Sequence, residues 1–295
     1  MLSLKLLHTL THPNAVYAAA FTPDGKTLAT ASLDNTIKLW NVADGKEQAR
    51  LKGHGDGVCG VAFSADGTKL FSASLDKTVK IWDAAAGSAL ATLTGHQDYI
   101  ECFAASADGK TLITGSHDKD VRVWSAEGSS IAVLKGHTDA VYCVALSPDG
   151  KLAASGSLDN KLLLWEVGSG KSRPLAGHDG IVQSVAFSPD GQTLASGGSD
   201  TTIKWWDVAK AEVRTTLNGH EQLVKCLAYS ADGKLLASGS VDGQVIVWDG
   251  KIGIKLAAAA AHENSIYGVA FAPGGGLVAT ASFDRSIKLW RIEGL

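Results

Sequence analysis

Histidine and aspartate side chains recur together along this sequence at a spacing that could support two kinds of chemistry. A histidine beside a carboxylate and a hydroxyl group is the arrangement of a nucleophilic triad, and clustered histidines can bind zinc. A reaction centre is needed once, whereas this arrangement recurs at a nearly constant interval of 41 or 42 residues. We therefore predict that these side chains are structural. The pairs, each separated by 22 residues, are His12 and Asp34, His54 and Asp76, His96 and Asp118, His137 and Asp159, His178 and Asp200, His220 and Asp242, and His262 and Asp284.

A tryptophan follows each of these marker histidines by 28 residues, so the chain is divided into seven units. Residues 29–40 (ATASLDNTIKLW) and residues 279–290 (ATASFDRSIKLW) are identical at nine of twelve positions. The length varies only after the tryptophan, where a surface turn can absorb one residue. The seven tryptophans are Trp40, Trp82, Trp124, Trp165, Trp206, Trp248 and Trp290.

Few other residues offer chemistry. His8 and His117 lie outside the marker set and have no cysteine or carboxylate partners at ligand spacing, so we predict neither a metal site nor a cofactor. Cys59 lies five residues after its marker histidine, where we expect greater exposure than at the other cysteines. No basic neighbour in sequence indicates an activated thiolate there. The other three cysteines, six residues after their histidines, are predicted to be small packing residues: Cys102, Cys143 and Cys226.

Composition limits the partners. The 27 Lys and Arg residues nearly balance 30 Asp and Glu along the chain, so we expect no nucleic-acid partner. No run of 18 apolar residues is present, and Met1 to Leu10 lacks the features of a signal peptide, so we expect no membrane association. Four cysteines without short spacings fit a reducing compartment, which favours a cytoplasmic location.

Within a unit the apolar residues alternate with a period of two, which indicates strands. In unit four, Val141–Leu146 is followed by the turn Ser147-Pro148-Asp149-Gly150 and a second strand over residues 151–157. A third strand is expected over residues 162–167 and a fourth around residues 171–175. Each unit is thus predicted to be a four-stranded antiparallel meander.

Such a sheet cannot bury its faces alone, but copies stacked around an axis bury both. We therefore predict an all-β fold, a seven-bladed β-propeller that spans residues 1–295 as a single domain. Only residues 291–295 follow the last tryptophan, too few for a fourth strand, whereas Leu4–Leu10 aligns with fourth strands such as Ala89–Leu93. Residues 1–10 are expected to supply the outer strand of blade seven and to close the ring. The residue eight after each histidine fits a crowded innermost strand, because it is always alanine: Ala20, Ala62, Ala104, Ala145, Ala186, Ala228 and Ala270.

Two dipeptides identify a family. The chain resembles the WD40 repeat proteins, whose units carry Gly-His and Trp-Asp at comparable spacing in a four-stranded blade. Gly-His is intact in five units, and Thr11 and Ala261 replace the glycine in the first and last. Trp-Asp is intact at Trp82-Asp83, Trp206-Asp207 and Trp248-Asp249. In the other four units the aspartate is replaced by Asn41, Ser125, Glu166 and Arg291.

The resemblance implies a hydrogen-bonded set in each blade, formed by the histidine, the turn aspartate, the tryptophan and a serine two residues before the aspartate. Gly198 stands at the serine position of unit five, so blade five is expected to lack one member. The serines of the other units are Ser32, Ser74, Ser116, Ser157, Ser240 and Ser282.

The resemblance also implies a rim around the channel, formed by the residues three and five after each histidine and the residue before each turn aspartate. Four of the five tyrosines fall at these positions, which gives the rim an aromatic, charge-poor character. We predict a partner-binding surface there, although channel packing would also explain the tyrosines. The predicted binding residues are Tyr17, Leu33, Leu75, Tyr99, Glu101, His117, Tyr142, Leu158, Ile181, Leu223, Lys225, Tyr267 and Phe283.

These features predict a non-catalytic scaffold, monomeric as a propeller, that binds a peptide or a partner protein domain on the rim. One alternative is a structural spacer of a larger protein without a dedicated ligand, which the near-identity of units one and seven motivates. A second is a weakly specified hydrolase that uses Glu101 and His117 of unit three.

Overall fold

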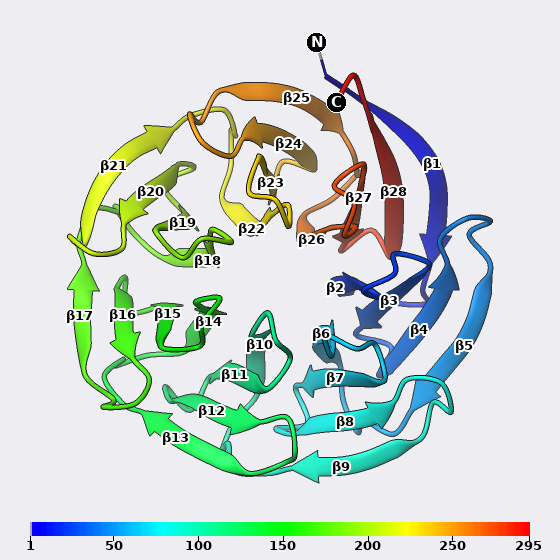
Figure 1. Ribbon diagram of the computed structural model, residues 1–295, viewed down its shortest axis with the longest axis horizontal. Helices are drawn as coiled ribbons and strands as arrows, with labels where there is room; N and C mark the ends of the chain where they lie inside the picture. Colours follow the sequence, from blue (N-terminus) through cyan, green and yellow to red (C-terminus); the bar gives the residue numbers. More distant parts are fainter. Residues whose placement is uncertain (1) are drawn as a thin grey trace.

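The computed structural model describes residues 2–295, in which 28 strands form seven four-stranded antiparallel sheets. The sheets stand as blades around a central axis, and the strands of each blade follow one another from the axis outward (Figure 1). The predicted all-β, seven-bladed propeller is confirmed. Within residues 2–295 the structure contains no helix long and apolar enough to cross a membrane.

The blades are numbered from the unit that begins at His12. Blade one consists of β2 (Val16–Phe21), β3 (Thr27–Ser32), β4 (Thr36–Asn41) and β5 (Glu47–Lys52). Blade two consists of β6 (Val58–Phe63), β7 (Lys69–Ser74), β8 (Val79–Asp83) and β9 (Ala89–Leu93). Blade three consists of β10 (Ile100–Ala105), β11 (Thr111–Ser116), β12 (Val121–Ser125) and β13 (Ser130–Leu134). Blade four consists of β14 (Val141–Leu146), β15 (Leu152–Ser157), β16 (Leu162–Glu166) and β17 (Ser172–Leu175).

The remaining three blades complete the ring. Blade five consists of β18 (Val182–Phe187), β19 (Thr193–Gly198), β20 (Ile203–Asp207) and β21 (Glu212–Leu217). Blade six consists of β22 (Val224–Tyr229), β23 (Leu235–Ser240), β24 (Gln244–Asp249) and β25 (Lys255–Ala260). Blade seven consists of β26 (Ile266–Phe271), β27 (Leu277–Ser282), β28 (Ser286–Glu293) and β1 (Ser3–Thr11).

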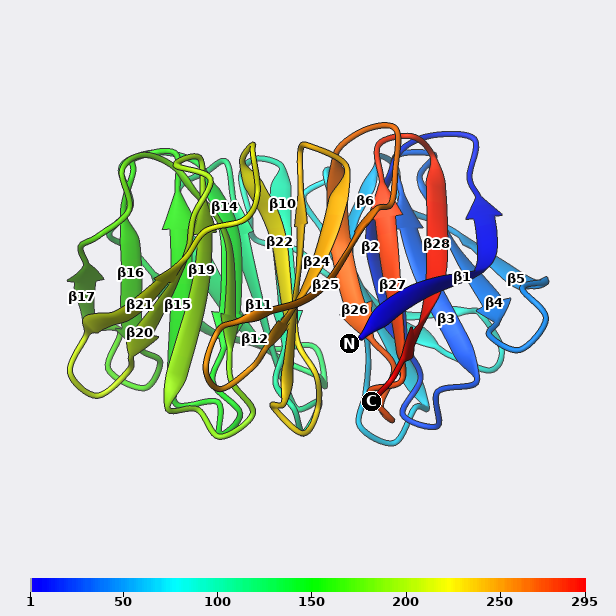
Figure 2. The same cartoon turned by 90° about the horizontal axis from the view of Figure 1, so that it is seen from above.

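The turns place two kinds of residue on opposite faces of the ring, which Figure 2 shows edge on. In a meander, the first and third turns lie at one end of the sheet, and the second turn and the link to the next blade lie at the other. We call the first the turn face; it carries hairpins such as 147–150, where Gly150 has φ 68° and Ser147 Oγ bonds Asp149 Oδ1 at 2.7 Å. The other, the rim face, carries the marker histidines and the turn aspartates.

The apolar core lies between neighbouring blades. Trp206 of β20 is fully buried in one cluster with Ala154 and Leu162 of the preceding blade, and Trp205 packs in the next cluster with Leu236 of blade six. Each blade thus buries both faces against its neighbours, as predicted from the apolar character of both strand faces.

Ring closure follows the prediction. β1 pairs antiparallel with β28 from Ser3 opposite Glu293 to Thr11 opposite Ser286, with a register shift after Leu6. The two chain ends lie side by side at the outer edge of blade seven (Figure 1). This pairing protects the edge of β28, which would otherwise present unpaired backbone groups.

Candidate functional site

A hydrogen-bonded polar set recurs in every blade. In blade four, His137 Nδ1 lies 3.0 Å from Asp159 Oδ2, and His137 Nε2 lies 2.7 Å from Ser155 Oγ. Trp165 Nε1 donates to the same Ser155 Oγ at 2.7 Å. Because the ionised carboxylate can only accept, the histidine donates from Nδ1 to Asp159, and Nε2 of the neutral ring accepts from the Ser155 hydroxyl.

The bridging hydroxyl is not the predicted one. It belongs to the residue four before the turn aspartate, and the serine two before it, such as Ser157, instead accepts Asp159 N–H at 3.1 Å and donates to Asp139 O at 3.0 Å. That prediction was wrong because the bridging residue lies two positions earlier on the second strand, next to the tryptophan of the third strand, whereas Ser157 is the last residue of β15. Threonine serves as well as serine there, so a search for serine alone misses it. The seven bridging residues are Thr30, Ser72, Thr114, Ser155, Ser196, Ser238 and Thr280.

Blade five therefore has a complete set. Ser196 Oγ lies 2.6 Å from His178 Nε2 and accepts Trp206 Nε1–H at 2.7 Å, so the expected gap at Gly198 does not exist. What blade five lacks is the turn serine, and Ser199 Oγ accepts the Ile181 N–H at 3.0 Å beside it.

Burial and pairing fix the charges of these sets. Burial lowers the pKa of the histidine in six of them, although the hydrogen bond to aspartate opposes the shift, so these rings are neutral at pH 7. Burial disfavours ionisation of the turn aspartates as well, but hydrogen bonds, such as those from His12 and Thr36 to Asp34, outweigh it and lower their pKa values. Both ring nitrogens are already bonded, so the sets hold the blades together and offer no free ligand.

A β-bulge directs one residue of every blade into the channel. In the pairing of the first two strands the register shifts at the residue five after the marker histidine; for example, Val16 pairs with Ser32 and Ala18 pairs with Ala31, so Tyr17 is left over. An extra residue in a bulge re-aims its side chain. The seven bulge residues all line the channel: Tyr17, Cys59, Glu101, Tyr142, Gln183, Lys225 and Tyr267.

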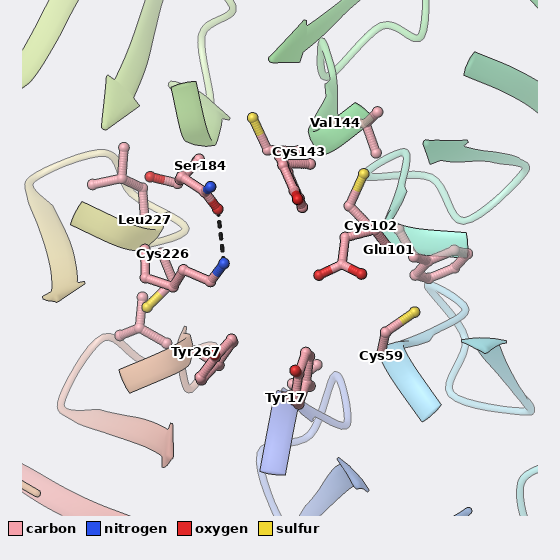
Figure 3. Close-up of a pocket in the computed structure, with 18 of the residues that line it drawn as sticks. Tyr17, Cys59, Glu101, Cys102, Cys143, Val144, Ser184, Cys226, Leu227 and Tyr267 are labelled. Carbon is pink, nitrogen blue, oxygen red and sulfur yellow. Dashed lines mark hydrogen bonds between the residues drawn. The ribbon is translucent and has the colours of Figure 1, made fainter. Parts of the chain in front are cut away.

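These residues form the mouth of a cavity of about 230 Å³ along the axis. Figure 3 shows the Glu101 carboxylate pointing into this space, with the rings of Tyr17 and Tyr267 at its edge. The Tyr17 and Tyr267 rings are stacked, with centroids 4.4 Å apart, and Phe283 lies 6.0 Å from Tyr267.

The Lys225 side chain extends across the mouth between the rings of Tyr267 and Tyr142. Its ammonium lies 4.9 Å from the Tyr267 centroid and 5.6 Å from that of Tyr142, and it donates to Gln183 Oε1 at 2.7 Å. Burial lowers the pKa of Lys225, and Glu101 partly opposes this. The predicted site residues omit Gln183, because they include only aromatic, charged and large apolar side chains; its bulge position in the repeat is the signal that identifies it.

The structure also brings Glu101 and His117 together. Glu101 Oε2 lies 3.5 Å from His117 Nε2, but this nitrogen has no hydrogen-bond partner within the described part of the chain. His117 stands edge-on to Tyr99 and Tyr142, both at 5.9 Å. Burial raises the pKa of Glu101, against the opposing influence of Lys225 and His117.

The other predicted rim residues surround this centre. Tyr99, Leu158 and Phe283 are exposed and the other ten are partly buried. Leu33 and Leu75 meet over Gly57, where a Cβ would lie 2.4 Å from Leu33 Cδ2. Leu158 adds an exposed apolar side chain to the rim face.

The cysteines are packing residues. All four are free thiols, and burial raises the pKa of each. The expectation that Cys59 is more exposed was wrong, because its Sγ turns into the wall between blades and donates to Ile100 O at 2.9 Å. Among residues 2–295, no three His, Cys, Asp or Glu side chains group closely enough to hold a metal ion.

Comparison with known proteins agrees with the repeat. The family model "WD domain, G-beta repeat" matches seven segments, at residues 4–41, 45–83, 87–125, 128–166, 170–207, 211–249 and 255–291. The chain is also similar to the periodic tryptophan protein 2 homolog of Schizosaccharomyces pombe, with 39% identity over 51 residues. That match covers 17% of this chain and 6% of the yeast protein.

Proposed function

This chain belongs to the WD40 repeat family, and on that premise we propose that it is a non-catalytic module that holds a peptide or a partner domain on its aromatic rim. WD40 propellers are typically protein-interaction scaffolds, so the general class follows from the family. The choice of the rim rests on the residues of this chain.

The observation that carries the proposal is the aromatic centre of the rim face. Tyr99 and Phe283 are both 45% exposed, which is unusual for rings of this size, and they flank a mouth lined by three further tyrosines. Binding energy concentrates in large aromatic side chains near the centre of an interface. The mouth is the centre of the rim face, so these rings stand where such anchors are needed.

The hydrolase alternative has one observation in its favour, the 3.5 Å approach of Glu101 and His117. Against it, burial keeps the four channel cysteines as thiols, and Lys225, the nearest basic group, is held by Gln183 and two rings. A carboxylic acid and a histidine at the mouth also suit recognition of polar groups on a partner, which needs no nucleophile.

The exposed rings provide the sharpest test. The wild-type protein is first used as bait to capture a partner. We expect the double substitution Tyr99→Ala and Phe283→Ala to reduce the free energy of binding to this partner by about 2 kcal/mol or more, with the melting temperature unchanged. The partner is identified by mass spectrometry, and its dissociation constant is measured for each purified variant.

A matched control removes equally exposed apolar groups elsewhere. Leu90→Ala with Ile131→Ala changes the outer strands β9 and β13 and should leave binding intact. Equal loss in both double variants would contradict the rim proposal. A bait that retains no specific partner at all would favour the spacer reading.

A further inference from the structure

A second candidate site lies on the turn face, in the groove between blades five and six. The groove encloses about 380 Å³ and is lined by residues of the 188–193 and 232–233 hairpins, the 250–251 turn, Trp205 and Arg214. An equivalent groove between blades two and three, lined by the 64–69, 108–110 and 126–127 segments, encloses about 230 Å³. The first groove is therefore an enlarged version of a recurrent feature, and the repeat shows which residues differ.

A glycine replaces a filling side chain at this groove. Gly250 stands two residues after Trp248, where the other blades carry a buried or partly buried aliphatic residue. Those residues are Val42, Ala84, Ala126, Val167, Val208 and Ile292. A Cβ at Gly250 would overlap Gly233 O, so in blade six the backbone of this turn packs directly on the hairpin at 233–235, and only glycine fits there.

Four further departures from the repeat lie in or beside this groove, and each brings a hydrogen-bond donor. Trp205 replaces a leucine, isoleucine or valine of the other units, and Tyr229 replaces phenylalanine, leucine or alanine. Arg214, on the outer strand of blade five, occupies the position of Gln48 in blade one, since each side chain bonds the threonine 21 residues before it. Lys251 adds an exposed ammonium where blades one and two have alanine.

Two of these groups are buried without a partner. Trp205 is 4% exposed and lines the groove, yet its Nε1–H has no acceptor among residues 2–295. The Tyr229 hydroxyl is likewise unpartnered, and it feels the charges of Asp190 and Arg214, which both line the groove. Buried polar groups are normally paired, so unpaired donors beside a cavity call for a partner from solvent or from a ligand.

Arg214 is also less occupied than its neighbour in the ring. Arg173, on the outer strand of blade four, donates to the carbonyls of Val208 and Ala209 in the adjoining turn of blade five. The corresponding turn residues of blade six are Gly250 and Lys251. Within the described residues, Arg214 bonds only Thr193 Oγ1, at 3.2 Å, and it forms no ion pair.

The two acids of the groove each use Oδ1 within their own turn, and Arg214 lies close enough to help lower the pKa of Asp190. Asp190 and Asp232 belong to hairpins that recur in the ring, and each accepts a serine hydroxyl and a backbone N–H of its own turn. When the aspartates that recur in the other blades are set aside, four groups distinguish this groove. They are the indole N–H of Trp205, the phenol of Tyr229, the guanidinium of Arg214 and the ammonium of Lys251. All of them can donate to an acceptor, and an arginine fork matches a carboxylate.

We propose that this groove is a second binding site, beyond the rim, that takes a glutamate or aspartate side chain of an acidic peptide segment of a partner protein. Arg214 pairs with the carboxylate, and Trp205 Nε1–H and the Tyr229 hydroxyl supply neutral donors. The turn that carries Lys251 also exposes Ile252 by 67% and Ile254 by 54%, which offers apolar contact to the residues that flank the acid. This contact favours a peptide over a free anion.

The test follows the indole N–H resonance of Trp205 by NMR in the full chain. The probe is a capped hexapeptide with two central glutamates between leucines, and its twin has glutamines instead. Trp205→Leu assigns the resonance, because the other seven tryptophans keep their signals. We expect saturable movement with the glutamate peptide and at least about tenfold weaker binding of the glutamine twin.

Variants that restore the residues of other blades should fold and should lose this binding. Arg214→Gln introduces the residue of blade one and is expected to weaken binding of the glutamate peptide by about tenfold. Tyr229→Phe introduces the residue of four other blades and is expected to weaken binding by a smaller factor. Lys110→Gln removes one positive charge from the groove between blades two and three and should change nothing.

Three outcomes would overturn the proposal. The first is an unmoved Trp205 resonance while the peptide binds elsewhere, for example near Lys225 at the rim. The second is equal binding of both peptides or an equal effect of Lys110→Gln. The third is inorganic phosphate that moves the resonance as strongly as the glutamate peptide, because the site would then be a general anion site. The rim variants Tyr99→Ala and Phe283→Ala leave this groove intact, so the two sites are tested separately.

Discussion

The ring contains histidine–carboxylate pairs of two kinds, seven in the blades and one at the channel mouth. In the blades, the histidine lies 2.8 to 3.2 Å from an aspartate and bonds a hydroxyl on its other side. At the mouth, His117 lies 3.5 Å from Glu101 and its Nε2 has no hydrogen-bond partner within residues 2–295. A histidine beside a carboxylate thus has all its hydrogen bonds made in the blades, whereas at the mouth one ring nitrogen lacks a partner.

The difference shows how a repeat separates structure from function. A group that recurs at every period and satisfies all its hydrogen bonds within the chain has nothing left for a ligand. A group found once, partly exposed and short of partners, has the capacity to bind one. Glu101 and His117 of the mouth are of the second kind. The indole N–H of Trp205 in the groove is buried, but it too has no partner among residues 2–295.

Acid should act most strongly on the blade sets. Burial lowers the pKa of six of their histidines, so the unfolded chain binds more protons than the folded one below about pH 6.5. Their contribution is complete above that pH and is lost as the pH falls through the folded-state pKa values. The aspartates act in the same direction below about pH 3.9.

We therefore expect the free energy of unfolding to decrease steeply from pH 7 to pH 5, by up to about 1.4 kcal/mol per pH unit for each proton taken up. Urea titrations at several pH values measure this slope. A flat profile over the same range would mean that the blade histidines have the same pKa in the folded and unfolded chains, and a rise in stability would mean that they are charged in the folded protein.

Removal of one bridging hydroxyl should have the next largest effect. Ser196→Ala leaves His178 Nε2 and Trp206 Nε1 buried without partners, which we expect to cost roughly 2–4 kcal/mol. The measurement is the urea midpoint. Ser130→Ala, at an exposed site on β13, is the control and should stay within about 0.5 kcal/mol. A cost no greater than the control would show that another group, such as a water, replaces Ser196.

The channel mouth should respond in the opposite sense. Burial raises the pKa of Glu101, so its ionised form is disfavoured in the folded state and its unfavourable contribution grows as the pH rises above about 4.3. Glu101→Gln should raise the melting temperature at pH 7 by at most about 4 °C and leave it unchanged near pH 4.

Lys225→Met is the companion variant, because it removes the opposing charge. If Glu101→Gln lowers stability at pH 7, the attraction between Glu101 and Lys225 outweighs burial. The mouth would then be a saturated structural site like those in the blades.

The smallest effect is expected at Gly198. A Cβ there would lie 2.8 Å from His178 Nδ1 and 3.1 Å from Ile181 O, so Gly198→Ser must displace the ring that Asp200 holds. We expect the free energy of unfolding to fall by about 1 kcal/mol, because the displacement of the His178 ring outweighs the new hydrogen bond of the serine, which contributes no more than about 1 kcal/mol. Thermal unfolding of the variant decides the sign; a gain would mean that blade five accepts the turn serine of its neighbours without strain.

The repeat made most of the fold predictable. The constant spacing from His137 to Trp165 predicted the strands of blade four to within about one residue, and the alignment of Leu4–Leu10 predicted the closing strand. Such features depend on local pattern and on counting, which the sequence contains. The bridging role of Ser155 was missed because Ser155 and Ser157 lie on the same face of β15, and only the register with β16 decides which of them reaches the tryptophan.

The contacts of the two sites could be predicted only in part. The rim positions come from the repeat, but the ammonium of Lys225 above the ring of Tyr142 joins residues 83 positions apart through two bulges. The direction in which Cys59 turns depends likewise on packing between neighbouring blades, and the close approach of Gly250 to the 233–235 hairpin depends on packing within blade six. Departures from the repeat, such as Trp205 and Arg214, are visible in the sequence, although their meeting in one groove is not.

The closing strand also sets the order in which the protein can be completed. Thr11 pairs with Ser286, about 275 residues later, and a ribosome that adds 5–20 residues per second needs roughly 15–55 s to make that partner. In six blades all four strands are consecutive in the chain and can pair as they leave the ribosome. In blade seven, β1 stays unpaired until β28 has been synthesised. The first and the last strands of the propeller therefore form the final contact, and synthesis itself determines when the ring can close.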